Sequence, residues 1–169
     1  AFSPDGKEAS VVNGLKRSVS FIDTTTRRTT KKVRVGREPQ AIAVTRDGLV
    51  AYVTNYKSNS VSELDLQTGR VTATILVERG PNGLAVTPDD RKVYVVNSES
   101  FTVSIIDRAS RKVTNTVAVG TSPNKIAFAA GEAKAYVTNT IGSTISVIDT
   151  TDEQIEMSLT AGAGDSPIY

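Results

Sequence analysis

The chain consists of four copies of one unit of 42 residues, and this repeat limits its possible folds more than any other feature of the sequence. An asparagine and an aspartate recur at that spacing along the whole chain. The recurring positions are Asn13, Asn55, Asn97 and Asn139, and Asp23, Asp65, Asp107 and Asp149. A fixed period of this length is typical of repeat architectures, in which each unit packs against its neighbours.

The composition excludes several classes of function. The 169 residues contain no cysteine and no histidine, which excludes disulfides, thiolate zinc sites, Ser-His-Asp triads and histidine-ligated haem. A net charge of +2 indicates neither nucleic acid nor a membrane surface as a partner. No apolar run is long enough to cross a membrane, and no signal peptide is recognisable. The chain starts inside a repeat without Met, which leaves an upstream targeting segment open.

Each unit contains four short apolar runs separated by turn residues. In the second unit the predicted strands are Ala41–Thr45, Val50–Thr54, Val61–Leu64 and Arg70–Val77. Runs such as Val93–Val96 are apolar on both faces, so the sheet that contains them needs cover on both sides. Sheets stacked radially like wedges provide that cover. The sequence therefore predicts an all-β protein, a β-propeller of four-stranded antiparallel blades.

We expect one domain, residues 1–169, with blades at residues 1–42, 43–84, 85–126 and 127–169. Asp165–Tyr169 and Ala1–Gly6 are predicted to be two parts of one inner strand, although their join is one residue shorter than in the internal units. Because the chain starts inside a strand, we expect a segment of a larger propeller, with a four-blade ring or a head-to-tail oligomer as alternatives. The first blade has nine basic and four acidic residues, and the fourth has one and six. These opposite charges would steer self-association through blades 1 and 4.

The repeat resembles a known family of propeller repeats. Ala51–Asn55 and Ala135–Asn139 both read AYVTN, and Ala85–Asp89 reads AVTPD, as in the YVTN family of β-propeller proteins. The resemblance covers the whole chain and implies a secreted, periplasmic or surface-layer location, often with seven blades. Two departures stand out: Ser10 replaces the tyrosine in the first unit, and Ala130–Glu132 replaces a Pro-Asp-Gly turn in the fourth.

The eight recurring Asn and Asp residues are interpreted as structural. Calcium loops gather several oxygen ligands within about a dozen residues, whereas these carboxylates are spread over separate blades. At strand ends, Asn and Asp fix turns by bonding to nearby backbone. The acidic pairs Asp89–Asp90 and Asp152–Glu153 are likewise expected to be solvated turn residues. We therefore predict no metal site, no cofactor and no catalytic residue.

Residues that break the repeat are better candidates for function. The loops from the second to the third strand of a blade, and from the fourth strand to the next blade, emerge on one face of a propeller. The candidate ligand- or partner-binding residues in these loops are Lys16, Arg17, Arg37, Gln40, Tyr56, Lys57, Arg79, Asn82, Glu99, Phe101, Asn124 and Lys125. Such a face suits an anionic or carbohydrate ligand, or a protein partner. The alternative is a set of variable, solvated loops.

Three functions from different classes remain. The leading expectation is a non-enzymatic scaffold outside the cytoplasm that binds a protein, small molecule or carbohydrate through its loop face. The first alternative is an enzyme similar to propeller lyases or lactonases. The second is a structural module of a surface layer, which would assemble with itself without any ligand.

Overall fold

The chain folds into short antiparallel strands, as its alternating apolar runs and turn residues predict. The computed structural model describes residues 1–129 and 133–160. One short 3₁₀-helix, η1 (Tyr56–Ser58), interrupts the strands of this part of the chain. The strands are β1 (Glu8–Asn13), β2 (Ser18–Asp23), β3 (Thr29–Arg34), β4 (Pro39–Val44), β5 (Val50–Asn55), β6 (Ser60–Asp65), β7 (Arg70–Leu76), β8 (Pro81–Val86), β9 (Lys92–Asn97), β10 (Thr102–Asp107), β11 (Lys112–Ala118), β12 (Pro123–Phe128), β13 (Lys134–Asn139), β14 (Thr144–Asp149) and β15 (Gln154–Thr160). Among the described residues, no helix is both long and apolar enough to cross a membrane.

The strands form four antiparallel meanders, one for each copy of the repeat. Their strand orders are β1-β2-β3, β4-β5-β6-β7, β8-β9-β10-β11 and β12-β13-β14-β15. In the first sheet, a bridge between Phe2 and Ala9 lies where a fourth strand would pair. This confirms the predicted propeller architecture of four-stranded antiparallel blades. The predicted inner-strand segment Asp165–Tyr169 and the predicted turn Ala130–Glu132 fall outside the described residues.

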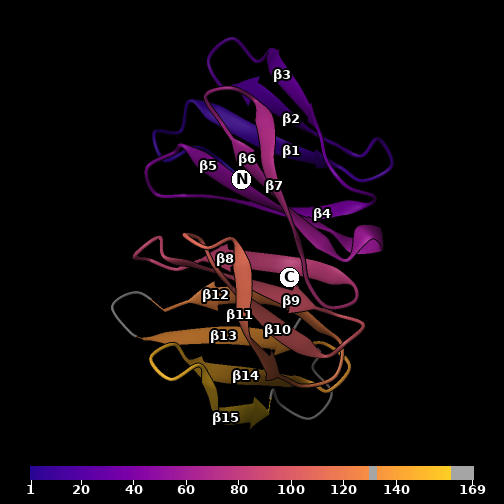
Figure 1. The fold of residues 1–169 in the computed structure, drawn as a ribbon, viewed down its shortest axis with the longest axis vertical. Helices are drawn as coiled ribbons and strands as arrows, with labels where there is room; N and C mark the ends of the chain where they lie inside the picture. The colour runs from indigo at the N-terminus through magenta and orange to yellow at the C-terminus, as the bar shows by residue number, and fades with distance from the viewer. Residues whose placement is uncertain (130–132, 161–169) are drawn as a thin grey trace.

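The four sheets follow one another in a fan (Figure 1). The inner strands β4, β8 and β12 pack closely against one another, whereas the outer strands β3, β7, β11 and β15 touch their neighbours only sparsely. The first sheet lies at one end of the row and the fourth at the other, and no extensive strand packing joins these two sheets in the described part of the chain. The described residues therefore form an open row of blades.

Three apolar cores hold the row together, one between each pair of neighbouring sheets. Phe21 packs against Leu64 and its neighbours in the first core, and Tyr52 lies with Val93 in the second. The third core places Tyr94 with Ile148. Burying one such side chain contributes about 1.5–3 kcal/mol, so these interfaces supply most of the driving force for folding.

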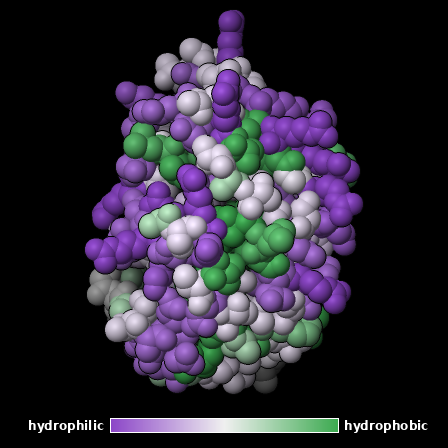
Figure 2. All heavy atoms as spheres, viewed as in Figure 1, coloured by the Kyte–Doolittle hydropathy of each residue, from purple (hydrophilic) through white to green (hydrophobic). Residues whose placement is uncertain are grey.

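The outward faces of the first and fourth sheets keep apolar side chains in solvent. Phe2 and Val11 are exposed on the first sheet, and Met157 and Leu159 on the fourth. On the face drawn in Figure 2, hydrophilic side chains predominate, with the largest group of apolar side chains near the middle and smaller groups above and below it. The outward faces of these two sheets carry the same apolar pattern that, inside the row, is covered by a neighbouring sheet.

The loops also repeat, because the same positions adopt the left-handed backbone conformation in successive units. Among the described residues, every positive φ falls at one of four repeat positions. The loop between the second and third strands, for example, has φ of 49° at Arg17, 48° at Asn59, 57° at Phe101 and 47° at Ser143. Residues other than Gly and Asn adopt this conformation at a cost of about 1–2 kcal/mol. The loop side chains of successive blades are therefore attached to backbone of the same conformation.

Candidate functional site

The loop face lies at the end of the sheets where second strands turn into third strands. Because strands alternate in direction, the connections from each fourth strand to the next sheet emerge at the same end. Of the predicted binding residues, those exposed to solvent are Lys16, Arg17, Arg37, Gln40, Lys57, Arg79, Glu99, Phe101 and Lys125. Those only partly exposed are Tyr56, Asn82 and Asn124.

A chain of polar contacts joins the loops of the second and third sheets on this face. Arg37 donates from Nη2 to the carbonyl oxygen of Lys57 at 2.9 Å. The ammonium of Lys57 lies 4.0 Å from Oε1 of Glu99, and Arg79 Nη2 lies 3.4 Å from Oε2 of the same carboxylate. The side chains of Lys57 and Arg79 remain more than half exposed, at 57% and 72%. Two predicted basic residues, Lys57 and Arg79, therefore flank the Glu99 carboxylate and keep their charged groups in solvent, and Arg37 is joined to them through the Lys57 backbone.

Tyr56 belongs to the same group. Hydrogen bonding to Glu99 raises the pKa of the Tyr56 hydroxyl, with a smaller contribution from burial. The ammonium of Lys57 lies 4.9 Å from the centroid of the Tyr56 ring, within the range of a cation–π contact. The aromatic ring is thus held among charged side chains and is neither packed into a core nor fully solvated.

A row of amides lies near the inner strands on this face. Gln40, Asn82 and Asn124 each occupy the second position of an inner strand, one repeat apart. Asn82 donates from Nδ2 to Oδ1 of Asn124 at 2.9 Å, which links two sheets. Lys125 follows Asn124, and its backbone N–H donates to Thr138 Oγ1.

The remaining candidates are separate from these two groups. Lys16 and Arg17 line a cavity of about 370 Å³ on the first sheet together with Lys32 and Arg34. Phe101 is 46% exposed on its left-handed turn. Among the described residues, no hydrogen bond or ion pair joins the side chains of these three candidates to Glu99 or to the amide row.

The eight recurring Asn and Asp residues bond within their own blades. Each asparagine donates from Nδ2 to the hydroxyl seven residues later, as Asn55 does to Ser62 at 2.9 Å. Each aspartate accepts from backbone N–H groups two or three residues later, and these bonds lower the pKa of the Asp23, Asp65 and Asp149 carboxyls. The pKa of Asp107 is lowered chiefly by the Ser110 side chain. Within the described part of the chain, no group of three or more acidic side chains could hold a metal ion.

A buried polar network between the second and third sheets escaped the sequence analysis. Glu63 is 4% exposed and lies at a repeat position that is Phe21, Ile105 or Val147 in the other units. Its carboxylate accepts hydrogen bonds from Tyr52 Oη at 2.9 Å and Thr72 Oγ1 at 2.7 Å. A β-bulge opposite Glu63 leaves Thr72 as the extra residue of β7 and brings its hydroxyl within reach.

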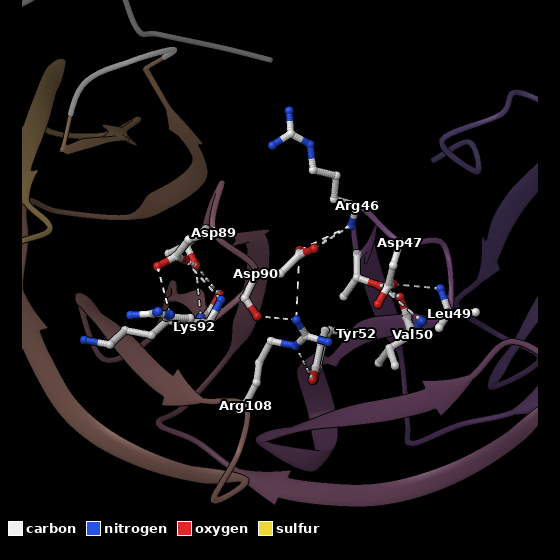
Figure 3. A network of polar contacts seen from close by, with 12 residues as sticks. Arg46, Asp47, Leu49, Val50, Tyr52, Asp89, Asp90, Lys92 and Arg108 are labelled. Carbon is white, nitrogen blue, oxygen red and sulfur yellow. Dashed lines mark hydrogen bonds and ion pairs between the residues drawn. The ribbon is translucent and has the colours of Figure 1, made fainter.

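Two arginines from the third sheet complete this network. Arg111 Nη2 lies 2.9 Å from Oε1 of Glu63. Arg108 donates from Nε to Tyr52 Oη at 3.1 Å and from Nη1 to the carbonyl oxygen of Asp90. Figure 3 shows the Arg108 guanidinium between Asp90 and Tyr52. Burial raises the pKa of Tyr52 to about 12 against the opposing effect of the Arg108 hydrogen bond. The signal in the sequence was Glu63 within the run VSELD, a charged residue at a position where the other units are apolar.

The open row of antiparallel four-stranded sheets, inner strands together and outer strands apart, defines a β-propeller. The chain belongs to the YNCE-like β-propeller family, whose family model matches residues 28–130. This confirms the predicted resemblance to propeller repeat proteins. No curated protein matches the chain.

Solved structures share the fold over nearly the whole chain. A chain of the Kuenenia stuttgartiensis hydrazine synthase is 28% identical, with a TM-score of 0.89, over 94% of this chain and 47% of that one. A protein of unknown function from Desulfotomaculum acetoxidans is 16% identical with a TM-score of 0.80, over 94% of this chain and 54% of its own. U3-55K is 13% identical with a TM-score of 0.85, over 95% and 50% of the two chains. The last two show the fold alone, and this chain spans about half the length of all three.

Proposed function

We propose that the chain is a non-enzymatic binding scaffold whose loop face takes an anionic carbohydrate. The observation that carries the proposal is the group formed by Arg37, Tyr56, Lys57, Arg79 and Glu99. Arg37 and Arg79 occupy one repeat position, whereas Tyr56, Lys57 and Glu99 differ from their equivalents in the other units, and the five residues form one connected surface. Their backbone groups close the loops, but their side chains belong to none of the three apolar cores, so the scaffold does not require these side chains.

The charge of the face favours an anion. Its basic side chains are Lys16, Arg17, Arg37, Lys57, Arg79 and Lys125. Its acidic side chains are Glu38, Glu78 and Glu99. Exposed guanidinium groups bind a carboxylate or sulfate through two parallel hydrogen bonds, which gives geometric specificity as well as attraction.

The neutral groups beside the charges favour a sugar. Asn82 and Asn124 offer amide donors and acceptors that match hydroxyl groups. The ring of Tyr56 provides an apolar surface with a polar end, a combination that suits the face of a sugar ring. An acidic protein segment would use the charges without the amide row, and it is the alternative outcome of the test below.

The test compares binding of polygalacturonate with binding of its fully methyl-esterified form, its uncharged counterpart, by calorimetry. We expect saturable binding of polygalacturonate alone, weakened at least tenfold in the double variant Lys57→Glu, Arg79→Glu. The matched control, Arg70→Glu with Lys112→Glu, changes the net charge equally on strands away from this face and should retain most of the affinity. Equal losses of affinity in the two double variants would show that binding depends only on net charge, and would contradict a binding site on the loop face. Binding of an acidic peptide but not of polygalacturonate would assign the face to a protein partner.

A second candidate is an enzymatic role, favoured by the 28% identity to a chain of hydrazine synthase. Against an independent activity, the buried carboxylate Glu63 is already bonded to Tyr52, Thr72 and Arg111. Turnover of lactone or ester substrates by the purified chain, with and without a metal chelator, separates the two classes. The scaffold proposal predicts no turnover in either condition.

We also propose a location outside the cytoplasm, which rests on the family resemblance. Fusion of the gene, with its own upstream sequence, to a reporter that is active only after export tests it. A purely structural surface-layer role would instead give ordered self-assembly of the purified chain without any carbohydrate, which light scattering detects.

A further inference from the structure

One repeat position receives different residues at the three interfaces between neighbouring sheets. The position follows the third strand directly and holds Leu66, Arg108 or Thr150. Leu66 is buried in the apolar core between the first and second sheets. Arg108 lies between the second and third sheets, and Thr150 faces the interface between the third and fourth.

Between the second and third sheets, the Arg108 guanidinium completes the environment of a buried tyrosine. Its Nε donates to Tyr52 Oη, and its Cζ lies 5.8 Å from the centroid of the Tyr52 ring. Its Nη1 bonds to the carbonyl oxygen of Asp90 and lies 4.0 Å from the Asp90 carboxylate. One planar cation thus satisfies a hydroxyl, a carbonyl and a carboxylate at once.

Between the third and fourth sheets, the equivalent tyrosine is Tyr94, and the threonine at position 150 is too short to reach it. Tyr94 is 0% exposed, and its hydroxyl has no hydrogen-bond partner among the described residues. A buried hydroxyl without a partner is costly, so this group is poised to bond to an added ligand. Its ring packs edge to face against Phe128, with centroids 5.2 Å apart and planes at 85°.

Tyr94 lines a cavity of about 440 Å³ at this interface. This volume lies within the range of small-ligand sites, roughly 300–1,000 Å³. Thr87, Asp89, Phe128 and Thr150 also line the cavity. The cavity therefore occupies the place that corresponds to Arg108 in the preceding interface.

The charges around the cavity favour a cation. Burial raises the pKa of Tyr94, and the negative charges of Glu153, Asp149 and Asp89 raise it further. Two cations also line the cavity and both are already paired, Lys92 with Glu153 and Arg91 with Asp89, whose Oδ2 lies 3.8 Å from Arg91 Nε. The Tyr94 hydroxyl thus lies in a negative electrostatic field, which favours a positively charged hydrogen-bond donor such as a guanidinium group.

We propose that the cavity between the third and fourth sheets binds a guanidinium group, which takes the place that Arg108 fills one repeat earlier. The group would donate to Tyr94 Oη and face the Asp89 carboxylate. Its source is a small guanidino compound or an arginine side chain of a peptide. The site lies at the opposite end of the sheets from the loop face and does not depend on the function proposed there.

The test measures binding of N-methylguanidinium by NMR titration, at concentrations far below those that denature proteins. N-methylurea has nearly the same shape without the charge and serves as the matched probe. We expect saturable binding of N-methylguanidinium with shifts confined to residues around Tyr94, and at least tenfold weaker binding of N-methylurea. Equal binding of the two probes, or shifts spread over the whole surface, would overturn the proposal. Argininamide and the tripeptide Gly-Arg-Gly, compared in the same way, distinguish a free compound from a peptide source.

Three variants locate the site. Tyr94→Phe removes the hydroxyl and keeps the ring, so affinity should fall roughly tenfold. Thr150→Arg supplies the guanidinium from the protein, so binding should be abolished and the unfolding temperature should rise. Tyr52→Phe removes a hydroxyl that the protein already uses and should leave binding unchanged. Undiminished binding by the Thr150→Arg variant would contradict the proposal even if Tyr94→Phe failed to fold.

Discussion

The interface between the second and third sheets and the interface between the third and fourth are built from the same repeat positions, yet one is closed by a polar network and the other is not. Glu63 and Arg108 meet the hydroxyl of Tyr52 in the first. Ile105 and Thr150 take their places in the second, and the hydroxyl of Tyr94 is left without a partner among the described residues. The repeat therefore fixes where side chains lie, while single substitutions decide whether an interface is sealed or can receive a ligand.

The largest expected effect comes from removing the carboxylate at the centre of the closed interface. Glu63→Ala leaves Tyr52, Thr72 and Arg111 without their shared acceptor in a buried place. We expect a loss of about 3 kcal/mol in the free energy of unfolding, measured by urea denaturation. A loss below about 1 kcal/mol would show that the network contributes little and would weaken the contrast between the interfaces.

A smaller loss is expected when the closed interface is given the residue of the open one. Arg108→Thr removes the donors to Tyr52 Oη and to the Asp90 carbonyl, so the free energy of unfolding should fall by about 2 kcal/mol. Arg70→Thr, on an exposed outer strand, is the control and should change it by less than about 0.5 kcal/mol. Equal losses of unfolding free energy in the two variants would show that the Arg108 contacts have no special role.

The smallest effect concerns the turn acids, which are alike at both interfaces. Hydrogen bonds from Thr45 and Thr87 lower the pKa of Asp47 and Asp89 below the ordinary value of 3.8. A lowered pKa in the folded state stabilises the fold above the unfolded-state pKa, and this stabilisation is lost as the pH falls through the folded-state pKa. We therefore expect Asp47→Asn and Asp89→Asn each to cost about 0.5 kcal/mol at neutral pH, because both groups are solvent-exposed, and nothing near pH 2. Unequal costs would show that the turns, and not only positions 63 and 108, distinguish the interfaces.

The sequence was sufficient for the fold because the repeat shows the same strand pattern four times. The predicted strand Val50–Thr54 is observed as Val50–Asn55, and Val61–Leu64 as Ser60–Asp65. Runs that are apolar on both faces required sheets on both sides, and the three cores provide them. Local patterning was informative because each strand is short and each turn recurs.

The sites were less predictable because they depend on contacts between sheets. Glu63 is visible in the sequence as a charge in an apolar run, but its partner Arg111 comes from a different unit. The contacts of Lys57 and Arg79 with Glu99, and of Arg37 with the Lys57 carbonyl, likewise depend on how neighbouring loops approach. Tyr52 and Tyr94 occupy equivalent positions in near-identical sequence, so only the structure distinguishes a bonded hydroxyl from an unbonded one.

The most direct test of this account is a comparison of Tyr52→Phe with Tyr94→Phe by urea unfolding at neutral pH. The two changes delete the same atom at the same repeat position. The account predicts that Tyr52→Phe lowers the free energy of unfolding by about 1–2 kcal/mol, because Glu63 and Arg108 each lose a partner, and that Tyr94→Phe is neutral or stabilising. Equal losses for the two variants would contradict it, because the two interfaces would then be energetically the same.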